Sequence, residues 1–312
     1  MWGLSTWTVG ISGVYFGEML PFWISIAALS LFQGALVAVP GAGAPGALAR
    51  LRGRRWALIP PLSVIGFVFG ARAAEQASAQ GLTYLALVAV PALAALALGW
   101  FAWNAHPPRP ARALWVAPLF ALAWVDRGGL LGEASALVLS ALSCVSLGVL
   151  LAAVTPPRWL AAGIVTMAVA DITLVVSDLL QRPNDALNAA HPVAGLPRLQ
   201  SAVFGSAVMG YGDLFVAASL GALIALTLGR RTQRSAAALA ALLAVTFDLL
   251  FFFIDELPAT VPVALTLIIV VLERRRRLAR KGALASPTEP PAEHLTQTAA
   301  HSPRASRTPT AR

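Results

Sequence analysis

Residues 201–228 read SAVFGSAVMGYGDLFVAASLGALIALTL and contain a single charged side chain, Asp213. A run of about 20 apolar residues is long enough to cross the hydrocarbon core of a bilayer as a helix. A charged side chain at the bilayer centre costs roughly 2.5 to 3.5 kcal/mol on insertion scales, so an aspartate there is a candidate functional group. Asp213 also closes the motif Gly210-Tyr211-Gly212-Asp213, whose two glycines permit close helix approach or a local kink.

The whole chain has the composition of a helical membrane protein. Its 312 residues are 58% hydrophobic and 12% charged, with a mean hydropathy of +0.73, whereas soluble domains carry about 25% charged residues. The apolar residues fall in separate runs near bilayer length, which excludes a soluble enzyme and a disordered protein. The single cysteine, Cys144, excludes an internal disulfide and a cysteine-rich zinc site. We expect no metal site and no cofactor.

The apolar runs predict an all-α fold, a polytopic bundle of nine transmembrane helices within residues 1–273. Residues 1–15 contain Trp2, Trp7 and Tyr15 and are expected to form an interfacial lead-in or a tenth span. Residues 274–312 are expected to form a basic, disordered cytoplasmic tail, because Pro, Ser, Thr and Ala dominate its later part. The nine predicted spans cover residues 16–39, 57–74, 82–103, 114–124, 130–154, 160–180, 201–228, 236–254 and 257–272.

Positive charge predicts the orientation of these spans. Cytoplasmic loops of membrane proteins accumulate Lys and Arg. Alternate predicted loops and the C-terminal tail carry most of the 23 basic residues of this chain. The N-terminus is therefore expected outside and the C-terminus in the cytoplasm, and arginine and alanine usage favours a bacterial cytoplasmic membrane. Because the charge flanks apolar runs, its expected partner is the lipid bilayer and not nucleic acid.

A second aspartate, Asp171, lies inside the predicted span 160–180. Asp171 lies about 9 residues before the outer end of its span and Asp213 about 12 after the next begins, roughly 14–18 Å deep at 1.5 Å per residue. Adjacent antiparallel helices would bring both carboxyl groups to one level. A facing pair can share a proton, so that one member activates water and the other donates a hydrogen bond to a peptide carbonyl.

Prolines open the last predicted span on the same side of the membrane, as Pro258-Ala259-Thr260 and Pro262-Val263-Ala264-Leu265. Proline there is expected to disrupt the first helical turn and to free backbone groups for an extended substrate. The residues expected to shape the site around Asp171 and Asp213 are Gly210, Tyr211, Gly212, Pro258, Ala259, Pro262, Ala264 and Leu265.

Together these motifs resemble the presenilin and signal peptide peptidase family of intramembrane aspartyl proteases. The resemblance covers residues 160–272, the expected catalytic helices, and implies a presenilin-like fold with Asp171 and Asp213 as the catalytic pair. It implies membrane-embedded peptide substrates, namely transmembrane segments or signal-peptide remnants. The orientation is similar to that of signal peptide peptidase. The chain departs from the family at Ala170, where a tyrosine is usual, and in its imperfect Pro-Ala-Leu motif. The sequence says nothing of oligomeric state.

Two other functions use similar residues. Prepilin peptidases also have a Gly-x-Gly-Asp motif, but theirs continues with a lysine where this chain has Phe215, and their aspartates open toward the cytoplasm. A non-proteolytic proton-coupled transporter would use buried aspartates to bind and release protons. Such transporters often consist of two repeated halves, and the sequence shows no internal repeat. A purely structural bundle, in which the aspartates join helices, also stays open.

Overall fold

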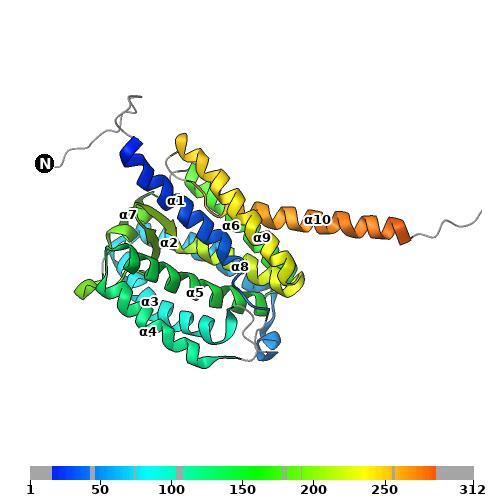
Figure 1. Cartoon of the computed structure of the whole chain (residues 1–312), viewed down its shortest axis with the longest axis horizontal. Coiled ribbons are helices and arrows are strands. Elements are labelled where there is room, and N and C mark those ends of the chain that lie inside the picture. The colour runs from blue at the N-terminus through cyan, green and yellow to red at the C-terminus, as the bar shows by residue number, and fades with distance from the viewer. Residues whose placement is uncertain are drawn as a thin grey trace, which may run out of the picture. The chain divides into compact units, whose positions relative to one another are not determined.

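The computed structural model describes residues 16–42, 46–73, 75–102, 108–177, 179, 181–190, 192–254 and 257–285. They are mostly helical (Figure 1). The α-helices are α1 (Phe16–Leu36), α2 (Ile59–Ala73), α3 (Glu75–Leu96), α4 (Val116–Val125), α5 (Leu130–Val154), α6 (Pro157–Val176), α7 (Gln181–Ala189), α8 (Tyr211–Thr227), α9 (Arg230–Asp248) and α10 (Val261–Ala285). Short 3-10 or π segments are η1 (Gly46–Leu51), η2 (Arg54–Leu58), η3 (Ala97–Phe101), η4 (Pro110–Trp115), η5 (Val193–Gly195) and η6 (Leu249–Phe252).

Several of these helices suit a membrane. Among the described residues, four helical stretches are long and apolar enough to cross a bilayer: Ala77–Phe101, Leu130–Val154, Pro157–Val176 and Arg230–Phe252. Shorter apolar helices cover Pro21–Leu36, Pro110–Val125 and Tyr211–Thr227. Each predicted span overlaps one of the α-helices, and α7 lies between two of the spans. The structure thus has the long apolar helices of an integral membrane protein, while the number of spans stays a prediction.

The core of residues 1–270 forms where α8 lies between α1 and α5. Most residues of α5 and α8 are buried. The backbones approach closely at two glycines, because a Cβ on Gly148 of α5 would lie 2.8 Å from the carbonyl carbon of Ala218 on α8, and a Cβ on Gly221 of α8 would overlap the carbonyl of Val37 at the end of α1. Small residues at such crossings let membrane helices pack by direct backbone contact.

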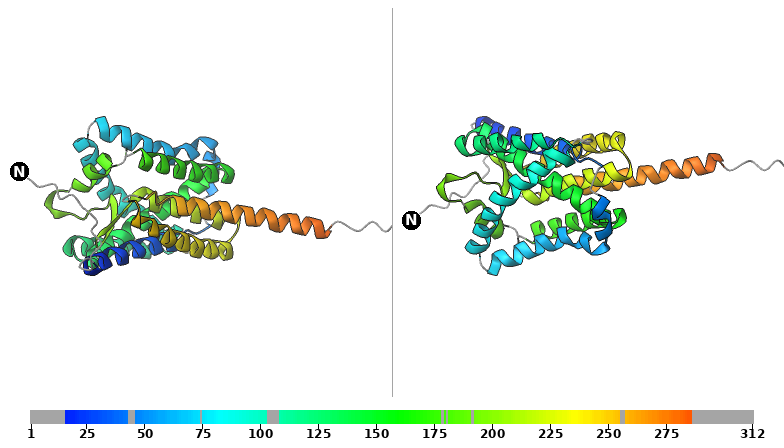
Figure 2. Two further views of the ribbon diagram at one scale, coloured as in Figure 1. Left: turned by 90° about the horizontal axis from the view of Figure 1, so that it is seen from above. Right: turned by 90° about the horizontal axis from the view of Figure 1, so that it is seen from below.

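A β-hairpin replaces the first part of the predicted span 201–228. Strands β1 (Ser201–Phe204) and β2 (Ala207–Gly210) pair antiparallel, with Ser201 opposite Gly210. The helical prediction for residues 201–210 is therefore wrong. The two-residue loop contains Gly205 with φ +59°, a conformation that favours glycine, and Val and Phe suit the flanking strands. The hairpin lies at the end of the bundle from which α1 starts (Figure 2).

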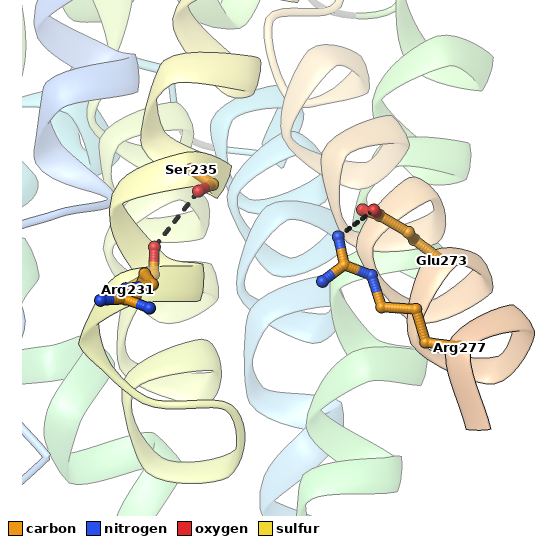
Figure 3. Close-up of polar contacts among 4 residues, drawn as sticks. All are labelled: Arg231, Ser235, Glu273 and Arg277. Atoms are coloured by element: carbon orange, nitrogen blue, oxygen red, sulfur yellow. Dashed lines mark hydrogen bonds and ion pairs between the residues drawn. The ribbon is translucent and has the colours of Figure 1, made fainter. Parts of the chain in front are cut away.

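Several helix boundaries also differ from prediction, and α3 begins at Glu75 rather than at residue 82. Helix α9 begins at Arg230, not at residue 236, and its first turns carry side-chain bonds such as that from Ser235 Oγ to the carbonyl of Arg231, 3.3 Å (Figure 3). Helix α10 continues to Ala285, so the prediction of disorder is wrong for residues 274–285. Arg, Leu, Ala and Lys are good helix formers, and Glu273 pairs with Arg277 one turn later (Figure 3). The rest of the predicted tail and residues 1–15 lie outside the described residues.

Candidate active site

Asp213 lies in the first turn of α8, directly after the hairpin. The amide of Gly210 donates a hydrogen bond of 3.1 Å to Asp213 Oδ2. A carboxylate in the first turn of a helix is stabilised by the free amides and the dipole there. The predicted position, about 12 residues into a helix, is wrong because residues 201–210 are the hairpin and not helical turns.

Asp171 lies near the end of α6, which finishes at Val176. Its Oδ2 atom accepts two hydrogen bonds from Thr260, one from the hydroxyl at 2.7 Å and one from the backbone amide at 3.3 Å. Thr260 is fully buried and immediately precedes α10. The segment with the prolines therefore holds Asp171 through both polar groups of one residue.

The two aspartates lie on α6 and α8, which pack against each other. Both aspartate side chains are partly buried. A Cβ on Gly212 would lie 3.7 Å from Cε of Met167. Met167 precedes Asp171 by one helical turn and shares its face of α6. The residue next to Asp213 therefore faces the turn of α6 next to Asp171, where α6 packs against α8.

A side chain not predicted for the site, Gln33 of α1, joins two parts of it. Gln33 is 1% exposed, and its Nε2 donates to the carbonyl of Ala259 at 3.0 Å and to that of Asp213 at 3.4 Å. The bond to Ala259 and the longer contact with Asp213 connect the start of α8 to the segment before α10. The sequence carried a signal for it, because Gln33 is the one amide side chain in the predicted span 16–39.

Tyr211 is held from α5. Its hydroxyl lies 2.6 Å from that of Ser143. Ser143 has one hydroxyl hydrogen, which it donates to the carbonyl of Ser140 at 2.6 Å, so the Tyr211 hydroxyl is the donor in the pair. Cys144 Sγ lies 3.8 Å from the carbonyl of Tyr211. These contacts anchor the turn that precedes Asp213 to the buried core helix.

The proline segment differs from its predicted role. Its exposed backbone groups were expected to be free for a substrate, but the carbonyl of Ala259 accepts from Gln33 and the amide of Thr260 donates to Asp171. Pro258 lies before α10, and Pro262 lies in the first turn, where proline is tolerated. Ala264 is buried, whereas Pro262 and Leu265 line a shallow groove with Phe247 of α9. Pro262 and Leu265 thus lie on the side of α10 that faces α9.

The arrangement offers two carboxyl groups on neighbouring helices, each held by hydrogen bonds from the chain. Among the described residues, no group of three or more His, Cys, Asp and Glu side chains could hold a metal ion. No family model matches the sequence, and neither a curated protein nor a solved structure is significantly similar to it. The function of the site therefore has to be inferred from its own residues.

Proposed function

We propose that the chain is an intramembrane aspartyl endopeptidase that hydrolyses peptide bonds of transmembrane segments or signal-peptide remnants. The observation that carries the proposal is the convergence of three segments far apart in sequence. Asp171 on α6 accepts two hydrogen bonds from Thr260, and the turn before Asp171 faces Gly212, the residue next to Asp213 at the start of α8. Placing two ionisable side chains on apolar helices costs free energy, so such a pair is a candidate functional site. Two carboxyl groups also supply the acid and the base that peptide hydrolysis needs.

The chemistry follows from one proton shared by the two carboxyl groups. The ionised member removes a proton from a water molecule, which attacks the peptide carbonyl carbon. The neutral member donates its hydrogen to the carbonyl oxygen, and this stabilises the tetrahedral intermediate. When the intermediate collapses, the proton taken from water passes to the amide nitrogen, the C–N bond breaks, and the proton on the oxygen returns to the second carboxylate. Thr260 keeps Asp171 in place, and Gly212 leaves the space beside Asp213 free of a side chain. Positioning of this kind lowers the barrier because the reacting groups are oriented beforehand.

The finer expectations from the sequence belong to the same proposal. They are a presenilin-like bundle of nine spans in a bacterial cytoplasmic membrane, with the N-terminus outside and the C-terminus in the cytoplasm. The hairpin and the start of α8 would then lie toward the outer side. Substrates would be membrane-embedded peptides that reach the carboxyl pair from the lipid.

The proton-coupled transporter is the rival from another class. It too needs exchangeable protons on Asp171 and Asp213. The hydrogen bonds of Gln33 and Thr260, which fix the site from two further segments, favour a rigid catalytic site over an alternating one. Reconstituted vesicles distinguish the two functions. A protease cleaves a peptide without moving a solute, whereas a transporter moves a solute without cleaving a peptide.

The test is cleavage of a labelled single-span peptide by purified protein in liposomes. We expect wild type to cut within the span and both D171N and D213N to lose cleavage while keeping their insertion and solution behaviour. D185N is the matched control, since Asp185 on α7 is exposed and the change removes the same charge. Cleavage that persists in both single variants would defeat the proposal. If wild type cleaves no peptide but carries a pH-dependent flux that D171N and D213N lose, the site belongs to a transporter.

A further inference from the structure

A cavity of about 360 Å³ lies between α1, η3, η4, α4 and α5. Ten side chains line it, and none of them carries a charge, an amide or a hydroxyl group. Phe32 and Leu36 of α1 face Ala141 of α5 across it, and Trp115 of η4, which is 66% exposed, lies at its rim. Ordered water needs polar partners that this lining does not offer. In a protein with membrane-spanning helices, the matching occupant is a hydrocarbon chain.

Two arginines belong to the segment that carries Trp115. Arg112 precedes Trp115 by three residues on η4, a 3-10 helix in which residues three apart eclipse each other. Arg112 therefore projects on the side of η4 that carries Trp115. Arg109 lies just before η4, and its backbone amide donates a hydrogen bond of 3.0 Å to the carbonyl of Gly99 in η3. Because Gly99 has no side chain, Pro110 packs directly against it and holds η4 over the cavity.

The positive charge of these arginines is not neutralised by a neighbouring carboxylate. Among the described residues, no carboxylate forms an ion pair with Arg109 or Arg112. Both belong to a loop predicted to be cytoplasmic, and the cytoplasmic leaflet carries the anionic lipids. Guanidinium groups bind phosphate oxygens through paired hydrogen bonds. Tryptophan at the rim suits the boundary between headgroups and acyl chains.

We propose that this cavity binds one acyl chain of an anionic phospholipid, whose phosphate group pairs with Arg112 and Arg109. The apolar lining selects a hydrocarbon chain, and the two arginines select the charge of the headgroup. The site is distinct from the carboxyl pair and does not depend on whether the chain is a protease.

Native mass spectrometry of the detergent-purified protein tests the site, with phosphatidylglycerol and phosphatidylcholine of identical acyl chains as probes. We expect one phosphatidylglycerol per chain to stay bound under conditions that remove phosphatidylcholine. An arginine near a membrane surface contributes about fivefold to the binding of an anionic lipid, so R109Q/R112Q should weaken retention of phosphatidylglycerol at least about tenfold. The matched control is R54Q/R55Q, which removes two exposed arginines of η2, a segment that contributes no side chain to the cavity.

A second variant tests the cavity itself. Ala141 is 3% exposed and lines the cavity, so A141F should fill it and abolish retention of the lipid, with size-exclusion chromatography checking that the protein stays folded. If A141F does not fold, R109Q/R112Q still tests the proposal, because these two side chains are not in the core. Three results would overturn the proposal: equal retention of both lipids, equal losses in the two arginine pairs, or a lipid-free dimer that shows the cavity filled by a second copy.

Discussion

Two aspartates pack against α1 in different surroundings. The carboxyl group of Asp213 accepts a hydrogen bond from the amide of Gly210, its backbone carbonyl accepts one from Gln33, and the neighbouring residue is Gly212, which has no side chain. Asp248 of α9 is 8% exposed, and its Oδ1 accepts one hydrogen bond of 3.0 Å from Ser30. Its Oδ2 is buried without a hydrogen-bond partner among the described residues. A single buried carboxyl group, such as that of Asp248, joins two helices. Peptide hydrolysis by carboxyl groups needs a second acid and room for the substrate.

The largest expected effect is on the rate of peptide cleavage, which should differ between a variant of the carboxyl pair and a variant of Asp248. We expect D171N to reduce peptide cleavage by about 10²- to 10⁴-fold, since general acid–base groups contribute that much. D248N removes a carboxylate from a site without a second one and should keep cleavage within about threefold of wild type, well below such a contribution. Initial cleavage rates in liposomes measure both. Equal losses in the two variants would remove the distinction drawn between the two regions.

The next largest expected effect is on stability, which should differ between the contact of α1 with α9 and the start of α8. A Cβ on Gly34 of α1 would lie 2.5 Å from backbone atoms of Ala241 on α9. G34A should therefore push these helices apart and destabilise the protein by about 3 kcal/mol, at the upper end for overpacked sites. On the other side, G212A has a nearest contact of 3.7 Å and should fold normally.

Thermal unfolding in detergent measures these differences. G66A is the control, because a Cβ on Gly66 of α2 meets nothing within 4 Å, and alanine favours a helix by about 1 kcal/mol over glycine. A G34A protein as stable as G66A would show that the α1–α9 contact is looser than the structure has it.

The hydroxyl of Thr260 gives a smaller effect, specific to the carboxyl pair. T260V keeps the shape and the backbone amide but removes the 2.7 Å hydrogen bond to Asp171. A hydrogen bond to a charged group contributes about 1.5 to 3 kcal/mol, so we expect cleavage to fall by roughly tenfold to a hundredfold with little change in stability. T266V is the matched control, since Thr266 is also buried and donates to the local carbonyl of Pro262. If T260V and T266V cleave equally well, Thr260 does not position the acid.

The smallest effect concerns Ser30. S30A removes the donor to Asp248 and should destabilise the protein by about 1 to 2 kcal/mol, because a buried acceptor then loses its partner. Cleavage should not change. The double variant S30A/D248L removes both polar groups and should recover part of that stability, as both unfolding midpoints would show. A double variant less stable than S30A would mean that Asp248 has a role beyond its bond to Ser30.

Helices were predictable from the sequence because long apolar runs carry a strong signal. The errors lie where this signal is ambiguous. Residues 201–210 are as apolar as the helix that follows, and only Gly205-Ser206 and the β-branched side chains distinguished a hairpin. Residues 274–285 are highly charged, and this was interpreted as disorder although the residue types favour a helix.

The candidate site was predictable in part. Placing Asp171 and Asp213 together followed from the order of the spans, but the depth calculation behind it assumed a helix through residues 201–210. Thr260 was noticed only as a departure from a family motif, whereas in the structure it is the donor to Asp171. Gln33 lies about 140 residues earlier in the chain than the first aspartate, and no local pattern indicates that a side chain on α1 reaches the start of α8.

The two close backbone contacts of α8 have a consequence for how a polypeptide reaches the carboxyl pair. At Gly221 and Gly148 the helix is wedged between α1 and α5, and no side chain there can yield to make an opening. On its other side α6 is largely uncovered by the rest of the chain. For the proposed protease, α8 therefore does not move to admit a substrate, and α6 is the less buried of the two helices that carry the carboxyl pair.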